Sequence, residues 1–248
     1  MPSVPRKLSE ANIYHIVSRG DSHQILFKDD EDRSAYLAAL TEKLAKFDSA
    51  LLAWCLMDNY IHLLVQADLS DLSHIMQQIH SSYALYFNKR YSRKGNLFQG
   101  KFKSEPVDTD DYLKTVVRYI HQTPERTGVA DTQNYAWSSY KEYLGAPAYT
   151  QCDFVLSVFG DKKAFAEFHE VIDLSAKCLG CNSSRKYLDD ATALRIAQAV
   201  IAPLDLEEIQ ELPRDQRNEA LQKLKETNLS MRQIERFTGV SKGVIQRV

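Results

Sequence analysis

Two apolar runs separated by one polar pair constrain the fold of this chain more than any other feature. Residues 51–57 and 61–65 are both typical of buried β-strands, and Asp58-Asn59 between them is a turn or bulge signal. In an extended chain, residues two apart share a face, so Tyr60 and His62 are expected to point the same way. The stretch therefore predicts a strand or strand pair with a histidine, His62, near the start of its second apolar run.

Segments on either side carry the remaining elements of one sheet-forming unit. Residues 13–18 alternate and are rich in Val, Ile and Tyr, which is typical of a strand. Apolar residues recur at steps of three and four over residues 29–47 and again over 70–90, which predicts two amphipathic helices, and residues 96–102 look extended. The order strand, helix, strand, strand, helix, strand predicts an α+β fold, a ferredoxin-like antiparallel sheet with helices on one face.

Composition narrows the class of protein. The chain has 248 residues, of which 44% are hydrophobic and 26% charged, which suits a folded soluble protein with one sizeable core. No run approaches the roughly 18 apolar residues of a membrane span, so we expect a cytoplasmic protein without a membrane partner. The four cysteines are too few for a disulfide framework and are expected to be reduced. Cys178 and Cys181 are interpreted as free thiols of a loop, since a closed zinc site needs about four ligands.

The formal net charge of −2 hides a basic stretch. Between Leu85 and Lys103 there are six basic residues and no acidic one, interleaved with aromatic side chains. Basic side chains neutralise phosphates and aromatic rings stack on unpaired bases, which makes the stretch a candidate nucleic-acid face. The alternative is a solvated helix end whose aromatic residues belong to the core. The candidate DNA-binding residues are Lys89, Arg90, Arg93, Lys94, Lys101 and Lys103.

A third helix is predicted over residues 112–123. We expect it to end there, because Pro124 pushes the preceding residue out of the α region. Tyr119, Gln122 and Thr123 lie three and four residues apart on one face of this helix. A tyrosine beside short polar groups at a helix end is a candidate nucleophile. A half-buried packing residue is the more common role for such a tyrosine.

Five blocks in this order and spacing resemble the single-tyrosine HUH transposases, and in particular the branch associated with REP elements of bacterial genomes. The blocks are Tyr14-His15-Ile16-Val17-Ser18-Arg19-Gly20, Cys55-Leu56-Met57 through His62-Leu63-Leu64, Gly95-Asn96-Leu97-Phe98-Gln99-Gly100-Lys101-Phe102, Arg118-Tyr119-Ile120-His121 with Pro124, and Trp137-Ser138-Ser139. The resemblance implies a homodimeric, ferredoxin-like nuclease domain that binds hairpin-forming single-stranded DNA. It also implies a tyrosine that forms a 5′-phosphotyrosine link, helped by a divalent ion, Mg²⁺ or Mn²⁺, on two histidines.

The family motif carries over to this sequence only in part. Tyr119 matches the nucleophile and His62 matches the second histidine of the metal motif. Tyr60, however, stands in place of the first histidine, Asp58 replaces a proline, and Thr123 replaces the usual amide ligand. Three positions around the expected metal therefore depart from the family pattern.

These departures leave two function classes open. A neutral phenol with a pKa near 10 is a poor metal ligand at neutral pH, so metal affinity is expected to fall. Asp58 is an even number of residues from His62 and its carboxylate suits Mg²⁺ or Mn²⁺, but only if the chain is extended through Asn59. The chain is thus either an active transposase working through Tyr119 or a catalytically degenerate relative that retains DNA binding.

The sequence after the family blocks predicts helices. We expect a nuclease domain over residues 1–146, a helical linker region over 147–213 and a helix-turn-helix DNA-binding domain over 214–248. The last of these has eight basic and four acidic residues, which favours contact with double-stranded DNA; a plain three-helix bundle is the alternative. The expected DNA-binding residues are Arg232, Lys242, Gln246 and Arg247.

Overall fold

The computed structural model describes residues 6–21, 24–145, 147–172, 178–179, 190–225, 227 and 229–248. These residues form two compact units, and each unit is described by itself. The first consists of the described residues up to Thr123, those from Thr132 to Glu170, and Cys178 with Leu179. The second contains residues 124–131, residues 171–172 and the described residues from 190 onward. The chain leaves the first unit after residue 170, within the stretch expected as a helical linker, whereas residues 124–131 belong to the stretch expected as the nuclease domain.

A four-stranded antiparallel sheet is the centre of the first unit. Its strands are β1 (Ile13–Arg19), β2 (Ala50–Met57), β3 (Tyr60–Gln66) and β4 (Lys103–Pro106), in the order β2-β3-β1-β4. Strands β2 and β3 form a hairpin in which Met57 pairs with Tyr60, so Asp58 and Asn59 make the turn. This order confirms the predicted ferredoxin-like α+β fold.

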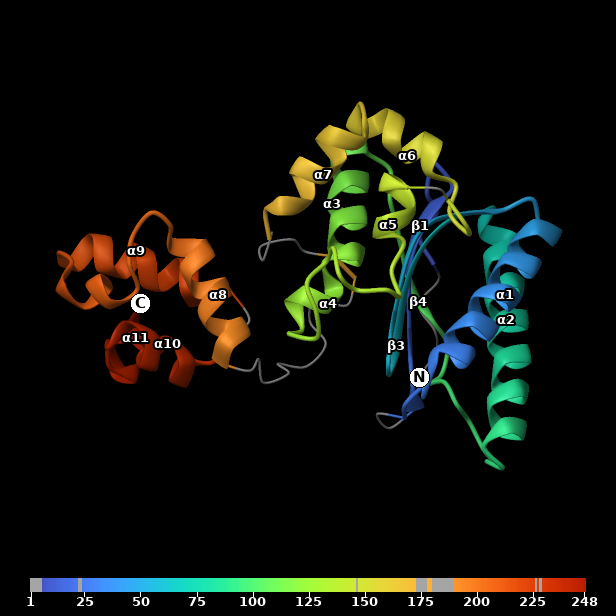
Figure 1. Ribbon diagram of the computed structural model, residues 1–248, viewed down its shortest axis with the longest axis horizontal. Coiled ribbons are helices and arrows are strands. Elements are labelled where there is room, and N and C mark those ends of the chain that lie inside the picture. Colours follow the sequence, from blue (N-terminus) through green and yellow to red (C-terminus); the bar gives the residue numbers. More distant parts are fainter. Residues whose placement is uncertain are drawn as a thin grey trace. The chain divides into compact units, whose positions relative to one another are not determined.

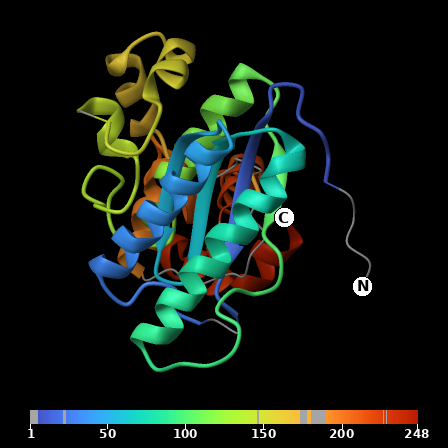
Figure 2. The same ribbon diagram turned by 90° about the vertical axis from the view of Figure 1, so that its right-hand side faces the viewer.

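Two long helices cover one face of this sheet, as Figures 1 and 2 show. Helix α1 (Asp30–Lys46) is capped by Asp29, whose carboxylate accepts from the backbone N–H of Asp32, and helix α2 (Leu69–Arg90) runs beside it. The apolar stripes predicted from the sequence are the ones that are buried. Each fully buried aliphatic side chain of these stripes contributes roughly 1.5–3 kcal/mol to folding.

Helix α3 (Asp110–His121) lies on the opposite face of the sheet, where it packs on β2 and β3 (Figure 1). Its N-cap is Thr109, whose hydroxyl accepts from the backbone N–H of Tyr112. The short helices α5 (Tyr140–Leu144), α6 (Cys152–Phe159) and α7 (Lys162–Glu170) pack around it, and α4 (Thr123–Arg126) follows it in the chain. The sheet is therefore covered on both faces.

The fourth strand begins later than the sequence suggested. Residues 96–102 are irregular, with one isolated bridge between Phe98 and Gly20, and regular pairing starts only at Lys103. Gly95 and Gly100 have φ values of 95° and 60°, a left-handed region that interrupts an extended chain. The prediction of a strand over residues 96–102 was wrong for this reason.

The second unit is helical and has its own apolar core. Its elements are α8 (Asp190–Ile201), the 3₁₀ helix η2 (Glu207–Glu211), α9 (Arg214–Lys225), α10 (Met231–Thr238) and α11 (Lys242–Arg247). A capping box joins Ser230 and Gln233 at the start of α10, and Gly239, with φ 69°, ends it. Only three residues separate α10 from α11. Among the helices that the structure describes, none is long and apolar enough to cross a membrane.

Candidate active site

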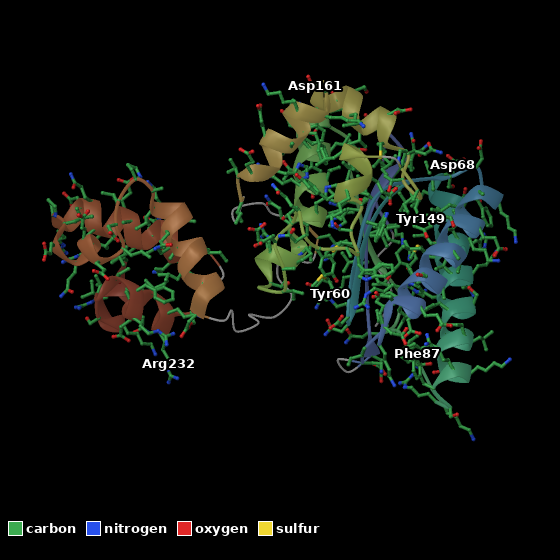
Figure 3. All side chains as sticks on the ribbon, in the orientation of Figure 1. Tyr60, Asp68, Phe87, Tyr149, Asp161 and Arg232 are labelled. Atoms are coloured by element: carbon green, nitrogen blue, oxygen red, sulfur yellow. The ribbon has the colours of Figure 1, made fainter. Side chains whose placement is uncertain are left out.

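The two residues expected to carry the chemistry meet on the face of the sheet that α3 covers. His62 lies on β3 and Tyr119 on α3, and their ring centroids are 5.5 Å apart in an edge-to-face contact. Tyr60, which is labelled in Figure 3, begins β3. Its ring also contacts His62 edge to face, with a centroid distance of 5.5 Å. Because Tyr119 is only 7% exposed, its hydroxyl-bearing ring lies in a largely dehydrated environment.

A second histidine joins this cluster, and reasoning from the sequence missed it. His15 lies on β1, where Val17 is the partner of His62, so His15 is two residues away on the same face. Its Nε2 atom is 3.0 Å from Nδ1 of His62, and its ring also contacts Tyr119. Burial lowers the pKa of His15, and the opposing effect of Glu105 does not reverse this shift. The imidazole of His15 is therefore neutral at pH 7.

Glu105 on β4 is the cross-strand partner of His15 and completes the cluster. Its Oε1 atom lies 3.1 Å from Nδ1 of His15 and accepts from the hydroxyl of Tyr112 and the backbone N–H of Leu179. Burial alone would raise the pKa of the Glu105 carboxyl, but these hydrogen bonds outweigh it and hold that pKa below its usual range. Glu105 is thus an ionised acceptor at neutral pH.

Two residues expected near a metal have other roles in the structure. Asp58 lies in the β2–β3 turn, where its side chain is 71% exposed and accepts from Arg33 at 2.6 Å. The extended path through Asn59 that would bring Asp58 to His62 is not formed. The hydroxyl of Thr123 donates to the backbone carbonyl of Tyr119 at 2.9 Å, a bond within its own helix end.

The side chains present do not make up a complete metal site of the family type. Among the described residues there is no group of three or more His, Cys, Asp or Glu side chains that could hold a metal ion. A neutral phenol at Tyr60 does not replace an imidazole ligand at neutral pH. A divalent ion at His62 would need oxygen ligands from outside the protein, such as phosphate or water.

The basic stretch divides into exposed and engaged residues. Lys89, Lys94, Lys101 and Lys103 are exposed, as expected for a DNA-binding surface. Arg90 instead pairs with Asp29, Glu31 and the fully buried Asp32, and Arg93 donates to the side chain of Asn88 and the backbone of Asn96. The charge of Arg90 is therefore largely compensated within the protein.

The aromatic residues of the same stretch belong mainly to the core. Phe87 is buried, while Tyr86, Tyr91, Phe98 and Phe102 are partly buried against the same cluster. Phe98 stacks on His80 with a centroid distance of 3.9 Å. These rings belong to the core, as the alternative interpretation of this stretch expected. The candidate nucleic-acid face therefore consists of the exposed lysines.

The C-terminal candidates lie on two consecutive helices of the second unit. Arg232 is exposed on α10 and projects outward from these helices (Figure 3), and Lys242 and Gln246 are exposed one turn apart on α11. Arg247 is exposed too, with its Nε donating to the carbonyl of Gly243. The carboxylate of Glu235 accepts from the backbone N–H of Lys242, so the first turn of α11 already holds an anionic group.

Comparisons with known proteins agree with this geometry. A family model described as "Transposase IS200 like" matches residues 9–123. A solved REP-associated tyrosine transposase bound to a REP hairpin has a TM-score of 0.50 at 16% identity, over 60% of this chain and 88% of that one. A crystal structure of a transposase candidate from Deinococcus radiodurans R1 matches with a TM-score of 0.33 and 19% identity, over 44% of this chain and 89% of that one.

At 16% identity the likeness to the REP-associated transposase shows a shared fold alone, and the search of curated proteins gave no match. The family model covers the sheet, both helices on its first face and α3, and it therefore includes His62 and Tyr119. Residues 9–123 of this chain are therefore similar to the family of IS200-like transposases.

Proposed function

We propose that this protein processes DNA as a strand-transfer enzyme, with Tyr119 as its nucleophile. The observation that carries the proposal is the contact of Tyr119 with His62 on the covered face of the sheet. In the proposed step the phenol of Tyr119 loses its proton and its oxygen attacks a backbone phosphorus, so that a phosphotyrosine link to the 5′ side forms. The bond from phosphorus to the 3′ oxygen breaks, and this oxygen takes up a proton and leaves as a 3′ hydroxyl. The hairpin-bound structural relative suggests hairpin-forming single strands as the substrate.

Covalent capture tests this proposal. The full chain is incubated with a labelled single-stranded hairpin in Mg²⁺, in Mn²⁺ and in EDTA, and denaturing gels are scanned for a protein–DNA band. The expected band is absent in Tyr119→Phe and present in Tyr149→Phe, because Tyr149 is a partly exposed ring that contacts Trp54 and is not part of the cluster. A band of equal intensity in Tyr119→Phe would contradict the assignment.

The second candidate function is DNA binding without cleavage, and the incomplete metal set around Tyr60 favours it. This function predicts hairpin binding that is independent of divalent ions and leaves no covalent band under any of the three conditions. The two candidates are therefore separated by the same gel, together with a binding measurement on the same hairpin.

The second unit is proposed to bind double-stranded DNA through α10 and α11. The exposed residues Arg232, Lys242 and Gln246 support this assignment. Lys242→Ala should weaken duplex binding and reduce the dependence of affinity on salt by about one counterion. The homodimer implied by the family resemblance stays a prediction, which light scattering of the full chain would test.

A further inference from the structure

Three hydrogen-bonding groups converge on one oxygen of Glu105. Oε1 accepts from the backbone N–H of Leu179 at 2.7 Å and from the hydroxyl of Tyr112 at 2.7 Å, and it lies 3.1 Å from Nδ1 of His15. A backbone N–H can only donate, and an ionised carboxylate can only accept. The hydrogen between Glu105 and His15 must therefore sit on Nδ1 of His15.

This first bond sets the direction of the next one. A neutral imidazole has one N–H and one acceptor nitrogen. Since the fully buried His15 uses its N–H toward Glu105, its Nε2 is the acceptor that faces Nδ1 of His62 at 3.0 Å. His62 must then donate from Nδ1, which leaves the lone pair on its own Nε2.

We propose that Glu105 and His15 are positioning residues that hold His62 in the tautomer with its hydrogen on Nδ1, so that Nε2 of the ring that contacts Tyr119 keeps its lone pair. Such an acceptor nitrogen can take a hydrogen bond from a phenol hydroxyl and leave the lone pairs of the phenol oxygen for an incoming phosphate. The other tautomer would present an N–H and compete for those lone pairs. The consequence for Tyr119 rests on the proposed function, whereas the tautomer itself does not depend on DNA.

Variants of Glu105 can distinguish whether its hydrogen bonds or its negative charge hold the tautomer of His62. In Glu105→Gln, an amide oxygen at the position of Oε1 accepts the same three bonds, so the direction of the chain is retained without the charge. Glu105→Leu removes the acceptor, and His15→Phe keeps a ring of similar shape without nitrogens. His74→Gln is the matched control, because His74 is exposed on α2 and is not in the cluster.

Nitrogen NMR of the full chain labelled with ¹⁵N-histidine reads the tautomer directly, and His62 is assigned by the signal lost in His62→Gln. We expect the Nδ1–H form of His62 in the parent, in Glu105→Gln and in His74→Gln, and loss of this preference in Glu105→Leu and His15→Phe. An Nε2–H form in the parent refutes the inference. An unchanged tautomer in both Glu105→Leu and His15→Phe also refutes it.

The rate of covalent capture then tests the consequence. Glu105→Leu and His15→Phe should slow formation of the protein–DNA band about tenfold, while Glu105→Gln should keep it within a factor of about three of the parent. Equal losses in Glu105→Gln and Glu105→Leu would mean that charge matters and would overturn the positioning role. If the parent forms no band, the proposed function fails, and the NMR result decides the tautomer independently.

Discussion

We expect mild acid to destabilise the first unit through His121 and His169, a pair buried between α3 and α7. Nδ1 of His169 donates to the carbonyl of Phe165 at 2.8 Å, so its Nε2 is the acceptor that faces Nδ1 of His121 at 3.0 Å. Nε2 of His121 in turn lies 2.7 Å from the hydroxyl of Ser139. Every ring nitrogen is thus used in a neutral chain, and an added proton would break one of its bonds.

The size of the effect follows from the pKa values. Burial lowers the pKa of His169 to about 4 from 6.5, and burial followed by the neighbouring His169 lowers the pKa of His121 as well. Between about pH 4 and pH 6.5, His169 binds a proton in the unfolded chain but not in the folded chain. The contribution of His169 to the free energy of unfolding is therefore fully present above pH 6.5 and is lost as the pH falls toward 4. A shift of this size amounts to roughly 3 kcal/mol, of which about 2 kcal/mol is lost by pH 5.

Urea unfolding at pH 7, 6 and 5 measures this loss, followed by tryptophan fluorescence. The only two tryptophans, Trp54 and Trp137, both lie in the first unit, so the signal reports on it alone. His169→Gln offers an amide oxygen to His121 and does not titrate, so the free energy of unfolding should fall by about 2 kcal/mol less in this variant than in the parent between pH 7 and 5. The exposed control His74→Gln should follow the parent. Equal losses in the parent and His169→Gln would refute the reasoning.

Three further perturbations test other parts of the structure. Tyr36→Phe should raise the free energy of unfolding by roughly 1 kcal/mol in urea, because its buried hydroxyl has no hydrogen-bond partner among the described residues. Arg90→Gln should cost about 2 kcal/mol in the same assay, since it removes the guanidinium from buried Asp32, yet it should weaken hairpin binding less than Lys94→Ala does. Ser230→Ala removes the capping box of α10 and should cost about 1 kcal/mol, measured by thermal unfolding in circular dichroism.

Periodicity predicted the elements that bury a continuous stripe or face. The helix over residues 70–90 and the strand pair around Asp58-Asn59 were predicted correctly because local sequence decides which side is apolar. Residues 96–102 contain two phenylalanines, which favour a strand, but Gly95 just before the segment and Gly100 within it adopt left-handed conformations that interrupt it. A glycine weakens a strand prediction without excluding it, so the pattern alone could not decide this segment.

Interactions between distant residues were beyond local reasoning. Arg90 was predicted to bind DNA because its neighbours in the sequence are basic. In the structure Asp29, Glu31 and Asp32, at a helix start about 60 residues earlier, pair with it instead. Likewise, the sequence motif predicted His62 and Tyr119, and the tertiary fold added His15 and Glu105. Only the strand register, with Val17 opposite His62 and His15 opposite Glu105, places these residues on one face.

The strand register changes what the tyrosine at position 60 implies for His62. A strand advances about 3.3 Å per residue, so a residue two positions along β3 lies about 7 Å from His62. A diagonal neighbour on the adjacent strand lies at a similar backbone distance, and His15 is such a neighbour. A motif read along one strand detects only the first of these positions. Tyr60 stands where the resemblance predicts an imidazole beside His62, while β1 supplies an imidazole whose Nε2 is 3.0 Å away. His62 is thus not isolated even with a tyrosine at position 60, because the contacts from Glu105 through His15 reach its Nδ1.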